Sequence, residues 1–192
     1  GILEVAPTVG IRALDVSLAN QLARFEELAA SLGADLGTPT VRDARAAFEA
    51  ASDDVRAAAA ATPGLTVVAI SATADEVYIG NPAAASDLMY FAELGVGFME
   101  LSGSADIVSG LFEELSWEQI RRYSADVFLN DVRGYSLTDE QLLAQPTFAL
   151  LPAARAGQIG PWSVEYVTSF QGVTPILTAL AETLHDARIV TA

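Results

Sequence analysis

Polar side chains follow a short apolar run in the second half of the chain. The run covers residues 127–129, and Asn130, Asp131 and Arg133 come directly after it. Such a run is typical of a strand in a parallel sheet, and open α/β sheets hold their ligands at the carboxyl ends of these strands. Arg133 would there donate several hydrogen bonds to an anionic ligand. The alternative is a surface arginine that is paired with Asp131.

Aromatic side chains follow a second predicted strand, over residues 158–160. Trp162 and Tyr166 come soon after it, where aromatic rings can stack on a ligand and supply a polar rim. The alternative is ordinary packing beneath a following helix. Tyr78, and Asn81 in the turn after it, lie at another predicted strand end and are weaker candidates for the same ligand site.

Enzyme signatures are absent from the sequence. Gly95 and Gly97 precede a predicted strand, whereas a dinucleotide-binding loop follows one. The chain has no phosphate-binding loop motif and no G-x-S-x-G motif. His185 is the only histidine and there is no cysteine, which makes a poor metal site. We therefore predict that the protein is not an enzyme, that it holds no metal or cofactor of its own, and that His185 is structural.

The composition indicates a globular chain. It has 192 residues, of which 52% are hydrophobic, and a mean hydropathy of +0.35, yet no apolar run reaches the about 20 residues of a membrane span. The net charge is −15, and all ten basic residues are arginine. A nucleic-acid partner is excluded, because it would need a dense cationic surface. The pairs Asp53–Asp54 and Glu113–Glu114 are expected on solvated faces.

The first third of the chain reads as helical. Apolar residues recur at helical spacing over 17–32, and Gly33 supplies a stop signal. Thr38 and Pro39 then open a second helix with a cap and a first-turn proline, and this helix runs to about Ala61. It is long enough, at roughly 35 Å, to bridge two lobes. The alternative is one amphipathic helix packed on a sheet.

The remainder alternates strands and helices, which predicts an α/β fold with a mostly parallel sheet flanked by helices. The unit over 115–134 combines a helix start, Ser116 and Gln119 forming a capping box, with the strand described first. The other predicted elements are strands at 66–71, 77–79, 97–101 and 158–160, helices at 84–94, from 138 and at 172–187, a helical turn at 146–151, and a loop over 102–115.

Two segments resemble a known family. SWEQIRRYSAD (116–126) and QPTFALLPAARAGQIGPW (145–162) occur in the order found in the C-terminal lobe of the iron-siderophore-binding proteins of bacterial ABC importers. This resemblance implies one Rossmann-like lobe of a two-lobed periplasmic-binding-protein fold. It also implies a ligand-binding role for Arg133, contact between Glu118 and arginines of the membrane permease, and a long helix that braces both lobes.

The resemblance divides the chain into three parts. Residues 1–37 are expected to form a linker and a helix, 38–63 the long interlobe helix, and 64–192 the α/β ligand-binding lobe. The N-terminal lobe of the family is expected to be absent from this chain, which we interpret as a fragment.

The function implied by the resemblance is that of a substrate-binding protein. It would capture a ferric siderophore or similar metal chelate between two lobes and deliver it to an ABC permease, without covalent chemistry. The protein is expected to be monomeric and extracytoplasmic, either periplasmic or a membrane-anchored lipoprotein. Alternatives are a cobalamin or haem carrier on the same scaffold, and a lobe of a chelatase-like or nitrogenase-like α/β enzyme.

Overall fold

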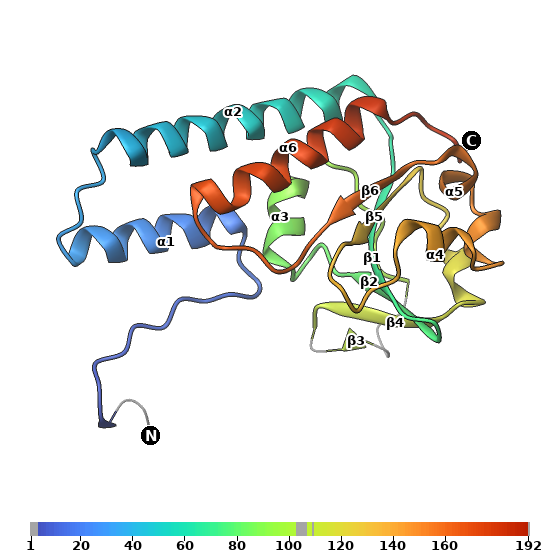
Figure 1. The fold of residues 1–192 in the computed structure, drawn as a ribbon, viewed down its shortest axis with the longest axis horizontal. Coiled ribbons are helices and arrows are strands. Elements are labelled where there is room, and N and C mark those ends of the chain that lie inside the picture. Colours follow the sequence, from blue (N-terminus) through green and yellow to red (C-terminus); the bar gives the residue numbers. More distant parts are fainter. Residues whose placement is uncertain (1–3, 103–106, 109, 192) are drawn as a thin grey trace.

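Helices and strands alternate along the chain in this computed structural model, which describes residues 4–102, 107–108 and 110–191. The helices are α1 (Leu18–Ser31), α2 (Pro39–Ala61), α3 (Ser86–Glu93), α4 (Asp139–Leu143), α5 (Pro152–Ala156) and α6 (Phe170–Asp186), with the 3-10 helices η2 (Gln119–Arg122) and η3 (Phe148–Leu150). The strands are β1 (Val67–Ala72), β2 (Glu76–Gly80), β3 (Ile107–Val108), β4 (Phe112–Ser116), β5 (Val127–Asp131) and β6 (Ile159–Trp162). The predicted α/β class is confirmed (Figure 1).

Within the described residues the strands form one six-stranded sheet in the order β3-β4-β2-β1-β5-β6. Strand β5 runs parallel to both β1 and β6, whereas the other three pairings are antiparallel. The expectation of a mostly parallel sheet is therefore wrong for the half that holds β2, β3 and β4. The turn between β1 and β2 is too short for the crossover that a parallel pair needs.

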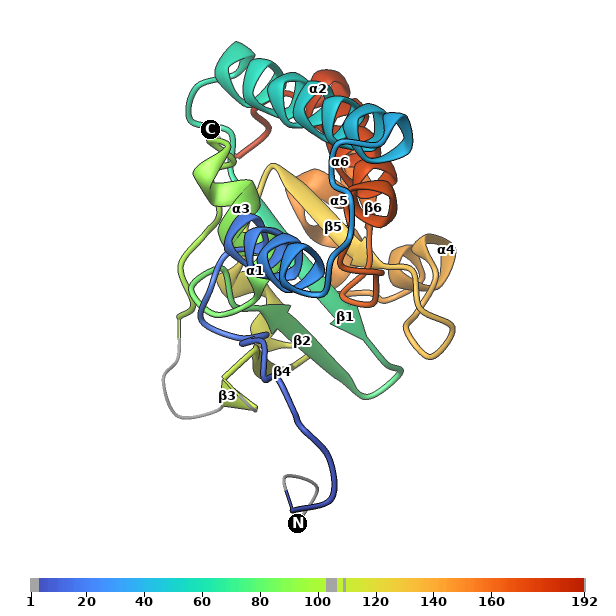
Figure 2. The same cartoon turned by 90° about the vertical axis from the view of Figure 1, so that its left-hand side faces the viewer.

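Helices cover both faces of the sheet, as Figures 1 and 2 show. Helices α1, α2, α3 and α6 pack on one face with Val67, Ala69, Val127 and Leu129. On the other face, α4, α5, η2 and η3 enclose a second core. The strand residues of that second core are Val68, Ile70, Ala72, Val77, Ile79, Leu115 and Phe128. Alternate residues of β1 and β5 thus point into different cores, and the whole length of β1 is buried.

Helix α2 is the longest helix in the described structure and lies along α6 (Figure 1). The Thr38 hydroxyl accepts a hydrogen bond from the backbone N–H of Val41 at 3.4 Å, and Pro39 opens the first turn. Its buried face carries Phe48 and Val55 together with the small residues Ser52 and Ala58. The 23 residues span about 35 Å. Its role between two lobes stays a prediction.

No helix in the described part of the chain is both long and apolar enough to cross a bilayer.

Strand β4 lies where the sequence predicts a loop; residues 103–106 and 109 of that loop lie outside the described residues. The expectation that Glu113 is solvated is also wrong, because Glu113 has 0% exposure. Its carboxylate accepts hydrogen bonds at 3.1 Å from the backbone N–H and from the hydroxyl of Ser102, and another from the Tyr123 hydroxyl. These partners satisfy a charge that would otherwise be costly to bury. Asp53 and Asp54 are exposed as expected.

The predicted strand at 97–101 is wrong as well. Only Phe98 forms an isolated bridge, with Val67 at the start of β1. Strand β2 pairs with β1 from Ile70 onward, so on that side the backbone N–H and C=O groups at the start of β1 are not paired with β2. The Val67 N–H donates to Gly97 O at 2.8 Å, and the Met99 N–H donates to Val67 O at 3.1 Å.

The unit over 115–134 is confirmed in its strand and altered in its helix. Strand β5 extends to Asp131, two residues beyond the apolar run. The predicted helix is the four-residue 3-10 turn η2, since Ser116 is still part of β4. The Ser116 N–H does donate to Gln119 Oε1 at 2.9 Å, and Ile120 is buried as expected.

The carboxylate of Asp126, just before β5, joins the start of β1 to the C-terminal segment of the chain. One oxygen accepts from the backbone N–H groups of Val190 and Thr191 at 2.7 and 3.0 Å, and the other accepts from the N–H and hydroxyl of Thr66, both at 2.8 Å. Burial alone would raise the pKa of Asp126, but these hydrogen bonds lower it from 3.8 to about 2. Asp126 therefore fastens the C-terminal segment to the start of β1.

The lowered pKa makes this junction pH-dependent. Stabilisation by Asp126 should be complete above about pH 4 and lost as the pH falls toward 2, because the unfolded chain then binds a proton that the native state does not. We expect the loss to be about 2 kcal/mol, measured by urea unfolding across this range. Asp126→Asn should cost about 2 to 3 kcal/mol at pH 7 and flatten the pH dependence. The exposed control Asp75→Asn should change little; equal stability of both variants would contradict the assignment.

Candidate functional site

A cavity of about 360 Å³ lies beside the carboxyl ends of β5 and β6. Asp87 enters it from the first turn of α3, Arg133 from the loop after β5, and Tyr166 from the loop after β6. Ala13 and Gln21 close it from the segment around the start of α1. The parallel arrangement of β5 and β6 brings both loops to one edge of the sheet.

Arg133 is held by two carboxylates. Its Nε donates to both oxygens of Asp131, at 2.9 and 2.8 Å, and Nη2 donates to Asp131 Oδ2 at 2.5 Å. Nη1 donates to Glu165 Oε1 at 3.3 Å. Asp131 has 0% side-chain exposure and Arg133 has 14%. The ring of Tyr135 lies 4.7 Å from the guanidinium carbon, which favours a cation–π contact. The pairing with Asp131, left open by the sequence, is present.

Trp162 lies in the core instead of facing the cavity. It is 2% exposed, and its indole N–H donates to Asp87 Oδ2 at 2.7 Å. Its ring packs at 6.3 Å from the ring of Phe112. The expectation that Trp162 stacks on a ligand is therefore corrected: the buried residue supports the site through its hydrogen bond to Asp87, which lines the cavity.

Asp87 and Tyr166 are the titratable groups of the cavity besides Arg133. Burial raises the pKa of Asp87 above its ordinary value of 3.8, against the opposing effects of the Trp162 hydrogen bond and of Arg133. Burial, and then the Asp87 carboxylate, raise the pKa of Tyr166 far above 10.0. Tyr166 thus keeps its proton, and its hydroxyl has no hydrogen-bond partner among the described residues.

Polar residues that the sequence did not single out hold the N-terminal segment against α3. The Gln21 side-chain N–H donates to Ser86 Oγ at 2.7 Å and to Ala13 O at 2.9 Å, and the Ser86 hydroxyl also donates to Ala13 O, at 2.8 Å. The available signal was the pair Ser86–Asp87 at a helix start, a pattern usually explained by capping alone. These contacts fix the part of the cavity wall that Ala13, Gln21 and Ser86 form.

Tyr78 and Asn81 lie outside the residues that line this cavity. The Tyr78 hydroxyl donates to Glu76 Oε2 at 2.6 Å, and this hydrogen bond, with burial, raises the pKa of Tyr78 to about 12. The Asn81 side-chain N–H donates to Gly110 O at 2.8 Å, and its oxygen accepts from the Ala83 N–H at 3.0 Å. Asn81 therefore holds its own turn through its oxygen and binds the segment before β4 through its N–H.

Glu118 is exposed at the start of η2, on the side away from the second core. Hydrogen bonds from its own backbone N–H and from Ser116 lower its pKa. The neighbouring Trp117 is buried, and its indole N–H donates to Ala74 O at 3.0 Å. Glu118 is thus an exposed charged group on a firmly anchored turn, and its contact with a permease stays a prediction.

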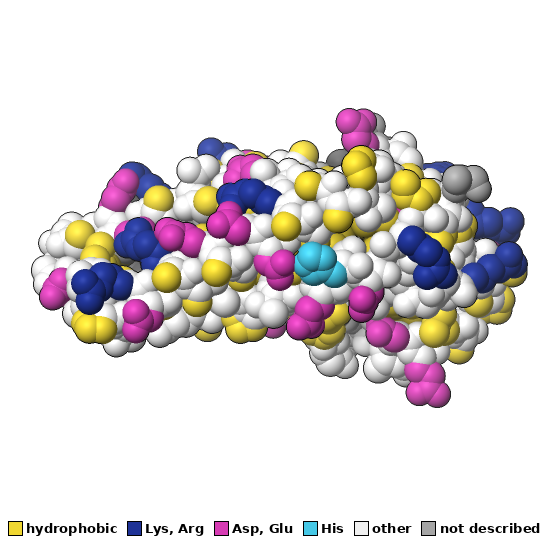
Figure 3. Space-filling view, turned by 90° about the horizontal axis from the view of Figure 1, so that it is seen from above, with side chains coloured by type: hydrophobic (Ala, Val, Ile, Leu, Met, Phe, Trp, Pro, Cys, Tyr) yellow, Lys and Arg dark blue, Asp and Glu magenta, His cyan; other side chains and the backbone are white. Residues whose placement is uncertain are grey.

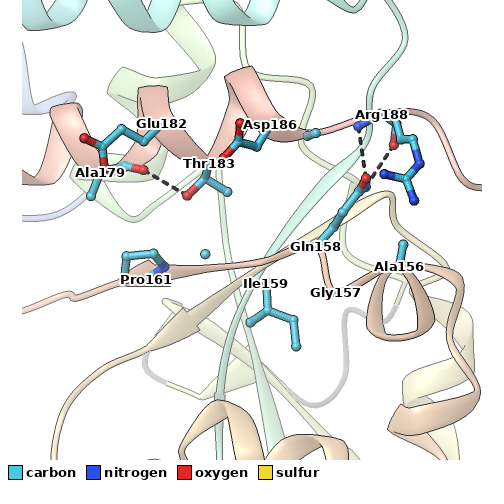
Figure 4. Close-up of a pocket in the computed structure, with 12 residues that line it drawn as sticks. Ala156, Gly157, Gln158, Ile159, Pro161, Ala179, Glu182, Thr183, Asp186 and Arg188 are labelled. Atoms are coloured by element: carbon cyan, nitrogen blue, oxygen red, sulfur yellow. Dashed lines mark hydrogen bonds between the residues drawn. The ribbon is translucent and has the colours of Figure 1, made fainter.

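A second hollow, of about 300 Å³, lies between β6 and α6 (Figure 4). Gln158 exchanges hydrogen bonds with the backbone of Arg188, at 2.9 and 3.1 Å, and the Thr183 hydroxyl donates to Ala179 O at 2.8 Å. The polar groups of Gln158 and Thr183 are therefore used within the fold, and none of the predicted site residues lines this hollow.

The helical face opposite the sheet mixes charges of both signs, and the histidine lies beside acidic side chains there (Figure 3). His185 Nε2 is 2.9 Å from Asp54 Oδ1, so it links α6 to α2. This contact agrees with the structural role predicted for it.

Comparisons with known proteins define the class. The family model described as periplasmic binding protein matches residues 3–163, and the chain belongs to that family. DesE, a ferric-siderophore receptor protein from Streptomyces coelicolor, is 40% identical over 98% of this chain, with a TM-score of 0.86. The match covers 63% of DesE, so this chain spans less than two thirds of that protein.

More distant structures share the fold. The petrobactin-binding protein YclQ from Bacillus subtilis is 17% identical, with a TM-score of 0.69 over 96% of this chain and 65% of its own. A siderophore periplasmic binding protein from Thermobifida fusca is 21% identical, with a TM-score of 0.65 over 96% of this chain and 67% of its own. No curated protein matches the sequence. The resemblance inferred from the two sequence segments is confirmed at the level of the family.

The hydrogen bond between Asp87 and Trp162 can be tested by its effect on stability. Asp87→Ala should lower the free energy of unfolding by about 2 kcal/mol, because it leaves the buried indole N–H without an acceptor. Asp87→Asn keeps an acceptor and should cost less. Urea unfolding of both variants, with Trp162→Phe and the double variant, measures the coupling. Additive effects of Asp87→Ala and Trp162→Phe would contradict this contact.

Proposed function

We propose that the protein binds a ferric siderophore and delivers it to an ABC permease, this chain providing the C-terminal lobe and the interlobe helix. The observation that carries the proposal is the 40% identity over 98% of the chain with DesE, a ferric-siderophore receptor protein. The neighbours are binding proteins, which fits a chain that captures cargo without altering it.

The geometry of the cavity supports this function. A guanidinium group has five N–H donors, and Arg133 uses three of them on Asp131 and Glu165. Two donors therefore remain, and the Tyr166 hydroxyl supplies a third toward the same cavity. Siderophores bind iron through oxygen atoms and carry further oxygens on their surface, so such donors suit them. A cavity of about 360 Å³ is at the lower end of ligand pockets, as expected for one side of a cleft between two lobes.

Binding should depend on Arg133. We expect ferric siderophores to quench the tryptophan fluorescence of the full-length protein, and Arg133→Ala to weaken that binding about tenfold or more. Arg56→Ala is the matched control, since Arg56 also pairs with an aspartate, Asp53, at 2.5 Å, but on the outer helix α2. The absence of quenching by hydroxamate, catecholate and haem ligands alike would contradict the function.

The proposed delivery to a permease implies a membrane partner and an extracytoplasmic location for the protein. The periplasmic binding protein family fits an extracytoplasmic location, where the protein would be free or anchored as a lipoprotein and would act as a monomer. Glu118 is the candidate contact with the permease. Its carboxylate is exposed while Trp117 and Ile120 fix the turn beneath it, so its position is set before any partner binds.

If Glu118 contacts the permease, a variant of this residue should change uptake without changing siderophore affinity. Glu118→Ala should leave siderophore affinity unchanged and reduce uptake of the iron complex several-fold in cells that depend on this protein, because a charged contact to the permease is lost. Glu140→Ala provides the control, as Glu140 is exposed in the first turn of α4. Unchanged uptake in the Glu118 variant would exclude the docking role and leave the binding function intact.

A further inference from the structure

The positive charge of Arg133 is already balanced within the lobe. Asp131 takes contacts from Nε and Nη2, and Glu165 takes one from Nη1. The local sum of these formal charges is therefore negative by one unit, with two carboxylates against one guanidinium. Asp131 cannot turn away from Arg133 into water, because its side chain has 0% exposure and also accepts the Arg133 backbone N–H at 3.1 Å.

The described residues that line the cavity supply no further positive charge. Among the described residues that line the cavity, Arg133 is the only base and Asp87 the only acid. Tyr135 covers one face of the guanidinium, and Arg133 lines the cavity with two of its N–H groups unused. Arg133 therefore offers hydrogen bonds without a net positive charge.

We infer that the site selects ferric chelates with no net negative charge, and that it uses Arg133 as a charge-compensated hydrogen-bond donor. The inference rests on the proposed function and names the class of ligand. A ferric complex of three hydroxamates is neutral, because each group carries one negative charge against the triply charged iron. A ferric complex of three catecholates is trianionic, since each group carries two. The negative cluster of Asp131 and Glu165 repels the second class.

Ligands that differ only in charge test this selection. One linear ferric trihydroxamate can carry a free terminal amine, an acetylated amine or a succinylated amine, which makes the complex cationic, neutral or anionic. We expect fluorescence titrations of the full-length protein to give affinities for the first two about tenfold or more above that for the third. Added salt should narrow the difference, because it screens charges that are partly exposed.

One variant tests whether the preference against the anionic complex comes from the carboxylates around Arg133. Glu165→Gln removes one of the compensating charges from a residue with 73% side-chain exposure, and it should reduce the preference against the succinylated complex by about threefold. Asp53→Asn removes a carboxylate with 76% side-chain exposure that pairs with Arg56 far along α2, and it should leave the preference unchanged. Both variants neutralise an exposed carboxylate that pairs with an arginine, and they differ only in their distance from the cavity.

The outcomes distinguish a failure of charge selection from a failure of siderophore binding. If the succinylated complex binds as tightly as the other two, or if Glu165→Gln changes the preference no more than Asp53→Asn does, the charge selection is overturned while siderophore binding stands. If none of the three complexes binds and catecholate complexes also fail, the proposed function itself is wrong.

Discussion

A carboxylate buried at the end of a strand must be paired, and this constraint organises the site. Asp131 ends β5 without any side-chain exposure, and an isolated charge there would be costly. Arg133 lies two residues farther on, so its side chain can fold back onto the carboxylate. Glu165, in the loop after β6, then joins the same guanidinium. One ion pair thus fixes the relative positions of the two loops that form the cavity.

The support beneath the cavity depends on an unusually large side chain in a small space. A Cβ atom at Gly80 of β2 would lie 2.8 Å from Leu88 and 3.1 Å from the Trp162 ring, so the glycine makes room for the indole above the sheet. The indole N–H then needs an acceptor, which Asp87 provides from α3. Strand β2, strand β6 and helix α3 are therefore linked through one aromatic ring, and the cavity is built on top of it.

The sequence predicts most elements because their signals are local. Capping at Thr38, the first-turn proline of α2 and the apolar run of β5 depend on neighbouring residues only, and these elements are confirmed. Strand β4 escapes prediction because Glu113 occupies a core-facing position, and only its distant partners Ser102 and Tyr123 make that possible. The prediction of a mostly parallel sheet fails for a similar reason. The antiparallel pairing of β2 with β4 depends on contacts between strands that are far apart in the sequence.

The difference between local signals and contacts with distant residues also explains why Arg133 lines the cavity and Trp162 does not. Both lie at or just beyond the carboxyl ends of strands that meet at one edge, and the sequence makes both of them candidates for ligand binding. Whether a side chain ends in the cavity or beneath it depends on α3, which lies far away in the sequence and contributes Asp87. Arg133 carries more hydrogen-bond donors than its two carboxylates occupy, whereas the single donor of Trp162 is used. The number of donors left over, more than the formal charge, therefore decides which residue can still bind a ligand.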